Sequence, residues 1–66
     1  MILDHNRTIL DTKQLNDTEE LILCRINNPS GMAYATWKRR IGTAATYYGN
    51  YYDNEGMARI GFQERR

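Results

Sequence analysis

The 66-residue chain has little of what usually stabilises or equips a very small protein. Its one cysteine, Cys24, excludes an internal disulfide. Its one histidine, His5, leaves few nitrogen ligands for a metal. No apolar run approaches the roughly 20 residues that span a bilayer, and the first residues lack the basic and apolar regions of a secretory signal. We therefore expect a single cytoplasmic domain over residues 1–66 that makes no contact with a membrane.

Aromatic residues are what the sequence has in quantity: five tyrosines, Trp37 and Phe62. A chain this short buries only about 60% of the surface that its unfolded form exposes, so its core supplies little net stability. Densely packed rings raise the buried apolar area while their polar tips still find partners. A homodimer, which would bury more area, is compatible with the sequence.

The charges are distributed unevenly along the chain. Residues 1–20 carry five acidic and two basic side chains, residues 21–52 carry four basic and no acidic ones, and residues 53–66 carry three of each. The formal net charge of +1 therefore hides an acidic start and a basic middle. A net charge this small argues against strong, purely electrostatic binding of nucleic acid.

Three segments have the composition of strands. Residues 21–26 are a short apolar run, residues 32–41 alternate, and residues 46–52 are rich in tyrosine. Between the first two lies a turn at residues 27–31, where Pro29 suits the second turn position, so these strands form a hairpin. Closer to the N-terminus the pattern is weaker, and it indicates a short strand at residues 8–10 and a turn or single helical turn at residues 17–20.

Alternation assigns side chains to the two faces of this sheet. In the second strand Tyr34, Thr36 and Lys38 share one face, and Ala33, Ala35, Trp37 and Arg39 share the other. In the third strand Tyr47, Gly49 and Tyr51 share one face, and Tyr48, Asn50 and Tyr52 share the other. One short helix covers only one face, so some of the tyrosines should be exposed in a monomer.

The segment at residues 55–65 fits two interpretations. As a strand, its apolar side chains alternate onto one face. As a helix, it is capped by Asp53 or Asn54, and Ala58 and Phe62 share a face because they are four residues apart. The residues alone do not decide between the two.

The C-terminal half resembles a pattern found in small proteins of phages and mobile elements. The residues that carry it are Tyr34–Trp37, Tyr47–Asn54, Ala58, Phe62 and Arg65. The resemblance implies strands followed by a helix, although Gly56 and Gly61 depart from it at about 1 kcal/mol each relative to alanine. Some small phage accessory proteins inhibit host defence nucleases, including CRISPR effectors, so the resemblance implies an inhibitor of that class. We predict an α+β fold, with a small antiparallel sheet of three to four strands and one C-terminal helix on one face.

No residue pattern indicates catalysis, a cofactor or a metal. Cys24 lies in the most apolar run, where cysteine usually behaves as a small buried side chain. Neighbouring carboxylates such as Asp17 and Glu19 lie on a polar segment with no sign of a pocket. His5, Cys24 and an acid such as Asp4 are ligand types that zinc accepts, but no paired ligand spacing supports a site. We predict a protein that is not an enzyme.

The predicted function is binding to a protein partner. Exposed aromatic rings beside arginine are typical of energetically dominant contacts in protein interfaces. The candidate partner-binding residues are Trp37, Lys38, Arg39, Arg40, Tyr47, Tyr48, Tyr51 and Tyr52. The interpretation is an accessory or inhibitor that occupies a surface of a host protein, such as a nucleic-acid-processing effector, in the host cytoplasm. The alternative is a nucleic-acid-binding module in which the cations contact phosphates and the rings stack on bases.

Overall fold

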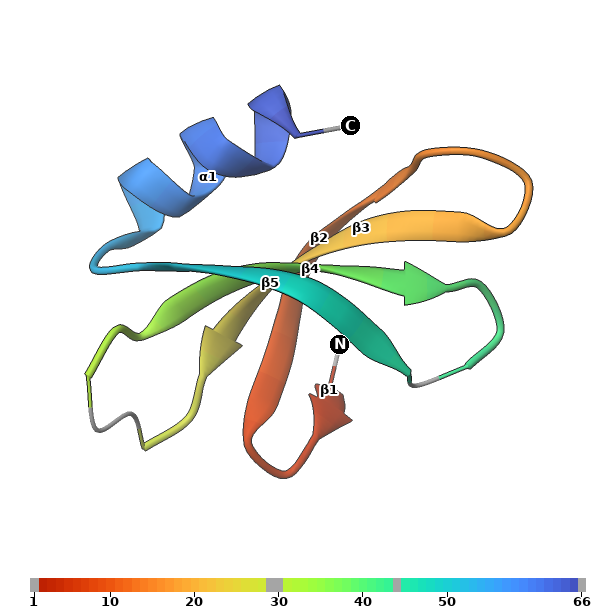
Figure 1. The fold of residues 1–66 in the computed structure, drawn as a ribbon. Coiled ribbons are helices and arrows are strands. Elements are labelled where there is room, and N and C mark those ends of the chain that lie inside the picture. Colours follow the sequence, from red (N-terminus) through yellow and green to blue (C-terminus); the bar gives the residue numbers. More distant parts are fainter. Residues whose placement is uncertain (1, 29–30, 44, 66) are drawn as a thin grey trace.

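The computed structural model describes residues 2–28, 31–43 and 45–65, which form an antiparallel sheet of five strands and one helix (Figure 1). The elements are β1 (Ile2–Asp4), β2 (Arg7–Gln14), β3 (Glu19–Ile26), β4 (Tyr34–Arg40), β5 (Thr46–Tyr52) and α1 (Glu55–Glu64). Each strand pairs with its neighbour in sequence, in the order β1-β2-β3-β4-β5. The predicted α+β fold and C-terminal helix are confirmed, and the sheet has more strands than the three to four predicted.

The additional strands come from the N-terminal part of the chain. The strand predicted at residues 8–10 is the middle of the longer β2, and the turn predicted at residues 17–20 is shorter because β3 already begins at Glu19. A bulge between Ile9 and Asp11 interrupts the alternation of β2. Ile9 therefore faces one side of the sheet and Asp11 the other, so this strand lacks a continuous period-2 signal.

The helix covers one face of the sheet (Figure 1). Leu21 and Leu23 of β3 have no exposed surface and pack against Ala58 and Phe62 of α1. Further side chains at the margin of this cluster are Leu10, Leu15, Tyr34 and Tyr52. Burying a leucine or phenylalanine side chain is worth about 1.5–3 kcal/mol, so this contact stabilises a helix that is too short to form alone.

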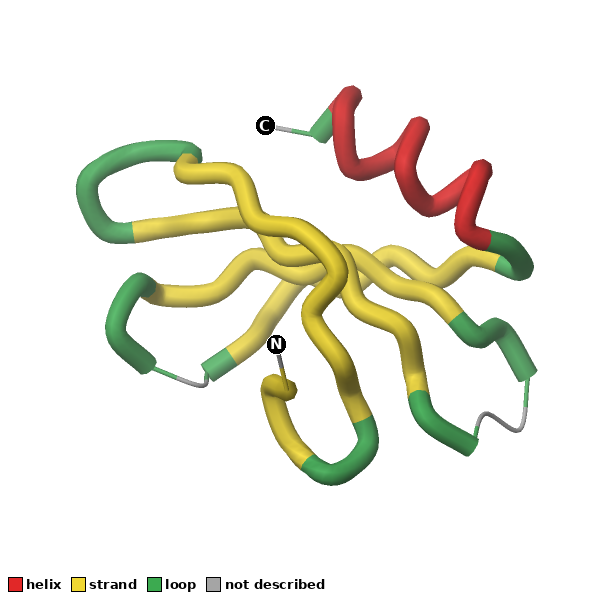
Figure 2. Tube along the Cα trace, turned by 180° about the vertical axis from the view of Figure 1, so that it is seen from behind, coloured by secondary structure: helices red, strands yellow, loops and turns green. Residues whose placement is uncertain are grey.

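The face opposite the helix, which we call the open face, has a buried cluster of its own. Its members are Ile9, Ile22, Cys24, Ala35 and Trp37. The strands twist strongly as they cross the molecule (Figure 2), and Arg7 of β2 donates from Nη1 to Thr46 Oγ1 of β5 at 3.0 Å. The predicted faces of β4 are confirmed, because Ala35 and Trp37 lie on the open face and Tyr34 on the helix side.

The predicted hairpin between β3 and β4 is confirmed. The two strands pair in antiparallel register, and the N–H of Ile26 donates to the carbonyl of Ala33 at 2.7 Å. The return strand is shorter than residues 32–41, since β4 spans Tyr34–Arg40. The turn position predicted for Pro29 lies outside the described residues.

The helix begins at one of the two caps that the sequence offers. Asn54 Oδ1 accepts a hydrogen bond from the N–H of Met57 at 2.9 Å, which satisfies a donor that has no intrahelical partner. The alternative interpretation of this segment as a strand is wrong. Gly61, which argued against a helix, has a packing reason: a Cβ there would lie 2.9 Å from Cε1 of Tyr52 and overlap the hydroxyl end of the ring.

Two cations hold the end of α1 on the sheet. Lys13 Nζ of β2 donates to the carbonyl oxygens of Phe62 at 2.8 Å, Gln63 at 3.2 Å and Arg65 at 3.0 Å. These contacts satisfy carbonyls at the helix end, where the macrodipole also favours a positive charge. Arg65 then reaches β4, where Nη1 donates to Thr36 Oγ1 at 2.9 Å. The hydroxyl of Thr36, which has no exposed surface, thereby gains a partner.

Candidate functional site

A β-bulge in β5 sets the geometry of the candidate site. The register between β4 and β5 shifts between Thr36 and Lys38, so Tyr48 and Gly49 both lie opposite Trp37. Tyr48 has a φ of 53°, in the left-handed region. This conformation costs a residue other than glycine about 1–2 kcal/mol. Such strain persists only where the surrounding contacts enforce it, and it is concentrated at functional sites.

The contact that enforces this conformation comes from Arg65. Its Nη2 donates to the carbonyl of Tyr48 at 2.6 Å, and its Nη1 donates to the carbonyl of Thr36 at 3.1 Å. The guanidinium of Arg65 therefore connects β4 and β5 at the point where the bulge interrupts the regular pairing of the two strands. Hydrogen bonds to a charged donor are stronger than neutral ones, which suits this position.

Tyr48 is also flanked by a cation and by a second ring. Its ring is 5.5 Å from that of Tyr47, edge to face, and Lys38 Nζ lies 5.7 Å from its centroid. Arg40 is exposed at the end of β4. Tyr48 itself is 73% exposed. We refer to Lys38, Arg40, Tyr47 and Tyr48 as the Tyr48 corner.

Glu19 fixes the base of this corner. The hydroxyl of Tyr47 donates to Glu19 Oε2, and Asn16 Nδ2 donates to Oε1 at 3.0 Å. The hydrogen bond from Tyr47 is the main cause that lowers the pKa of Glu19, and Lys38 and Arg40 contribute through their charges. The same hydrogen bond raises the pKa of Tyr47. Tyr47 is thus held in place as a neutral donor, which orients the ring beside Tyr48.

The eight predicted residues do not form one surface. Four of them make up the Tyr48 corner, and the others lie elsewhere. Trp37 is only 8% exposed, and the Arg39 side chain, 16% exposed, pairs with Glu20 at 3.1 Å. Tyr52 packs beside α1. Trp37, Arg39 and Tyr52 thus lie apart from the corner and have contacts within the fold, while Tyr51 is 54% exposed on the open face.

One predicted face assignment is wrong. Tyr47 was placed with Gly49 and Tyr51, but it pairs with Lys38 and bonds Glu19 on the helix side. The bulge at Tyr48 inserts one extra residue and so inverts the alternation on its N-terminal side. The assignments of Gly49 to the open face and of Tyr52 to the helix side are confirmed.

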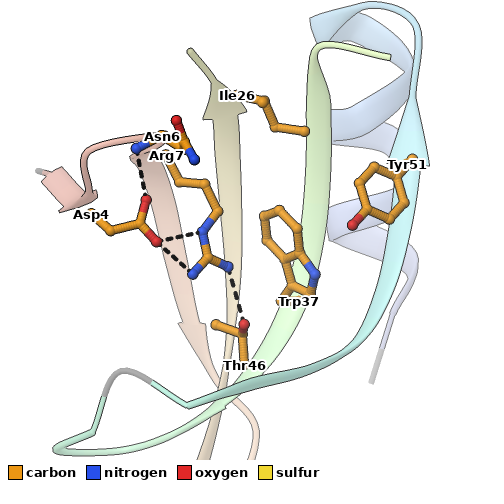
Figure 3. A pocket seen from close by; sticks show the side chains of 7 residues that line it. All are labelled: Asp4, Asn6, Arg7, Ile26, Trp37, Thr46 and Tyr51. Atoms are coloured by element: carbon orange, nitrogen blue, oxygen red, sulfur yellow. Dashed lines mark hydrogen bonds and ion pairs between the residues drawn. The ribbon is translucent and has the colours of Figure 1, made fainter. Parts of the chain in front are cut away.

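The open face contains a solvent-accessible pocket of about 450 Å³ (Figure 3). Its lining residues are Asp4, Asn6, Arg7, Ile26, Trp37, Thr46 and Tyr51. Trp37 separates the two sides of the pocket: the Arg7 guanidinium lies 4.9 Å from its ring centroid, and the ring of Tyr51 lies edge-on at 5.7 Å. Polar groups thus gather on one side of the indole and an aromatic ring on the other.

Arg7 is oriented by its neighbours in this pocket. Asp4 Oδ2 accepts from Arg7 Nε at 3.0 Å and from Nη2 at 2.7 Å, while Thr46 accepts from Nη1. The hydrogen bonds from Arg7 are the main cause that lowers the pKa of Asp4. Each nitrogen of the guanidinium is therefore engaged, which fixes its plane over Trp37.

The remaining candidates for chemistry offer no reactive arrangement. Cys24 is buried, as expected for a structural cysteine, and burial raises its pKa to about 11. Within residues 2–28, 31–43 and 45–65, no three acidic, cysteine or histidine side chains gather into a possible metal site. In the same ranges no helix has the length and apolar character needed to cross a membrane.

Comparison of the chain with protein-family models, with curated proteins and with solved structures gave no match. The resemblance to small phage proteins therefore stays a prediction. The geometry of the corner is the observation on which a functional argument rests.

Sequence reasoning missed the residues that build the site rather than those that occupy it. Glu19 and Arg65 organise the Tyr48 corner, and Arg7 organises the pocket. Each of these residues contacts a partner that is distant in the sequence. The alternation of side chains along a strand indicates only which face a residue shares with its near neighbours, so it could not predict these contacts. The run of tyrosines in β5 was the available signal, but it does not reveal the bulge.

Proposed function

We propose that this chain is a non-enzymatic protein-binding module whose contact surface is the Tyr48 corner. The observation that carries the proposal is Tyr48 itself. It is a large ring, 73% exposed, on a backbone with a φ of 53° that Arg65 holds from behind. Ring packing alone gives no reason to keep so exposed a tyrosine in a conformation that favours glycine.

The surroundings of Tyr48 suit a protein contact. Tyrosine supplies a rigid apolar ring with a polar tip, and interfaces concentrate their binding energy in such residues. Because Tyr47 and Arg65 fix the ring and its backbone before binding, little conformational entropy is lost on association. Lys38 borders the ring, and the charge of Arg40 acts on the neighbouring Tyr47 and Glu19, so the complementary surface is an acidic rim around an apolar recess.

The partner class follows from these features and from the predicted resemblance. A phage or mobile-element accessory of this size acts by occupying a surface, since it has few groups for chemistry. We propose a host cytoplasmic protein as the partner, with nucleic-acid-processing effectors as the first class to test. Their nucleic-acid channels are lined by cations, and we expect the corner to bind beside such a channel, on an acidic surface, rather than within it.

Affinity capture from a bacterial lysate, with and without nuclease, tests the proposal. The informative variant is Tyr48→Gly, which removes the ring and suits the left-handed backbone. Ile60→Ala is the control, since it removes an exposed apolar side chain, 56% exposed, on α1. We expect one stoichiometric protein that survives nuclease, that the control retains, and whose affinity falls by about 2 kcal/mol or more in Tyr48→Gly.

Two results would contradict this assignment. Capture that disappears with nuclease, with affinity that falls steeply as salt rises, would make nucleic acid the ligand. Equal capture by Tyr48→Gly and the native chain would place the contact elsewhere. Charge reversal separates steering from anchoring: Arg40→Glu should slow association, whereas Arg25→Glu, at an exposed arginine of β3, should leave the association rate unchanged.

A further inference from the structure

The outer edge of β5 is the least protected part of the backbone ladder. β5 is the last strand in the sheet order, and Tyr48, Gly49, Asn50 and Tyr51 are all exposed. Both faces of this stretch are therefore exposed, and among the described residues no further strand pairs with its outer edge. The strand carries no charge and no proline, the devices that usually protect an edge.

The ladder determines which backbone groups point outward. Ile26 donates to Ala33, and Ile41 to Thr18, so alternate residues of β4 between them bond to β3. Thr36 therefore bonds to Asn50 of β5. It follows that the C=O of Gly49 and both backbone groups of Tyr51 point away from the sheet.

The N–H of Gly49 points the same way. It belongs to the peptide unit that carries the C=O of Tyr48. That C=O accepts from Arg65 at 2.6 Å, and the same guanidinium binds the carbonyl of Thr36 on β4, so the C=O is directed toward β4. Since N–H and C=O of one peptide unit are opposed, the N–H is directed outward. Gly49 and Tyr51 thus each offer one donor and one acceptor to a further strand.

The side chains of the same two residues are complementary in shape. Gly49 leaves a gap in the row on the open face, and the indole of Trp37 lies in it: a Cβ on Gly49 would be 2.8 Å from Trp37 Cδ1. Two residues along, Tyr51 projects a ring that is 54% exposed. Beside both lies the 450 Å³ pocket, to which Trp37 and Tyr51 contribute lining.

We propose that β5 pairs antiparallel with β5 of a second copy of this chain, with Gly49 of each copy opposite Tyr51 of the other. A two-fold axis at Asn50 produces this register, in which every contact occurs twice, as an isologous interface requires. Each Gly49–Tyr51 pair exchanges two backbone hydrogen bonds. The two sheets become one continuous sheet, with both helices on one side and both pockets on the other.

The second copy also explains the pocket. The ring of Tyr51 from the second copy stands opposite Gly49, on the open face, and so enters beside Trp37. The indole then lies between two tyrosine rings, an arrangement of edge contacts that adds to the area buried. Asp4, Asn6 and Arg7 line the side of the pocket that lies across Trp37 from Tyr51 (Figure 3).

A second copy is favoured over an unrelated peptide because β5 contains both the gap at Gly49 and the ring of Tyr51 that fills it, so two copies of the strand fit each other. The gap and the ring that fills it are two residues apart in the same sequence, and no like charges oppose each other across the edge. The inference does not use the ring of Tyr48, so it stands or fails separately from the function proposed above.

Disulfide trapping gives the sharpest test. Asn50 faces itself across the axis as a non-hydrogen-bonded pair, with Cα atoms about 4.5 Å apart, within the range that a disulfide spans. We expect Asn50→Cys to form a covalent dimer at least about 10-fold faster than Asp53→Cys, an exposed control in the loop after β5. Cys24 is buried and should not compete. Equal rates for the two variants would overturn the register.

Self-association of the chain is measured by sedimentation from about 10 µM to about 1 mM, with Trp37 fluorescence as a local reporter. We expect a monomer–dimer equilibrium and a concentration-dependent change in the emission of Trp37. A monomer throughout this range would overturn the proposal. Tyr51→Ala should weaken the dimer at least about 10-fold, and Tyr51→Pro, which also removes the outward N–H, should weaken it further. Equal dimerisation by all three chains would contradict the edge pairing.

Discussion

At the scale of single residues, the two glycines of α1 have opposite roles although both lie inside one helix. A Cβ at Gly61 would overlap the end of the Tyr52 ring, whereas at Gly56 it would meet only Asn54 Oδ1 at 3.4 Å. We expect Gly61→Ala to lower the free energy of unfolding by about 1–3 kcal/mol. Gly56→Ala should raise it by up to about 1 kcal/mol, the helix-propensity gain. Urea denaturation of both variants measures the difference, and an equal effect would show that the Tyr52 ring moves aside freely.

The hydrogen bond between Tyr47 and Glu19 predicts how stability depends on pH. The pKa of Glu19 is lowered, so its contribution is present above its ordinary pKa and is lost as pH falls through the folded value. The pKa of Tyr47 is raised, so its contribution is present below about pH 10 and is lost as pH rises through the folded value. Tyr47→Phe should flatten the stability profile at both ends.

Unfolding by urea across the acid and alkaline ranges tests this. Tyr34→Phe is the matched control, since Tyr34 lies on the same side of the sheet and has no bond to Glu19. An unchanged acid limb in Tyr47→Phe would show that Asn16 alone holds the carboxylate.

At the scale of elements, α1 is joined to the sheet by its end as well as by its apolar face. Arg65→Ala would leave the buried hydroxyl of Thr36 without its donor, so we expect a loss of about 2 kcal/mol in unfolding free energy. Arg59→Ala, which removes exposed pairs with Glu55 and with Asp11 of β2, should cost less than about 1 kcal/mol. Denaturation curves compare the two. Equal losses would mean that the guanidinium of Arg65 is dispensable for docking.

The elements that could be predicted are those whose own side chains determine them. β3 contains the apolar run of residues 21–24, β5 has the composition of a strand, and the cap at Asn54 together with the spacing of Ala58 and Phe62 indicates a helix. β1 and β2 were largely missed, because their pairing depends on backbone hydrogen bonds and on a bulge at Ile9. Backbone hydrogen bonds do not depend on which side chains a strand carries, so a strand that is stabilised mainly by them has no clear sequence pattern.

The candidate site was predicted in composition and not in arrangement. The basic residues and tyrosines lie in the predicted strands, but the bulge separates them into the Tyr48 corner and the pocket. Nothing local marks the bulge, because Tyr48 is an unusual residue for a left-handed backbone. What enforces it is Arg65, 17 positions away.

At the scale of the whole molecule, Cys24 reports on global stability. It lies at the centre of β3 with no exposed surface, and burial raises its pKa to about 11. A thiol reagent needs an exposed thiolate, so labelling requires the sheet to open. At pH 8 we expect native chains to react at least about 100-fold more slowly than chains in urea. Comparable rates would show that β3 is transiently exposed without unfolding.

The meander topology has a consequence for how the chain folds. Every strand bonds to the strand beside it in sequence, so each hairpin closes through a short loop at little entropic cost. The contacts that span long separations are side-chain ones: Arg7 to Thr46 is 39 residues apart, and Lys13 to Phe62 is 49. The strands can therefore pair progressively, starting from the central hairpin. The contacts made by Arg7 and Lys13 form last, and they fix the positions of β5 and α1 relative to the first strands.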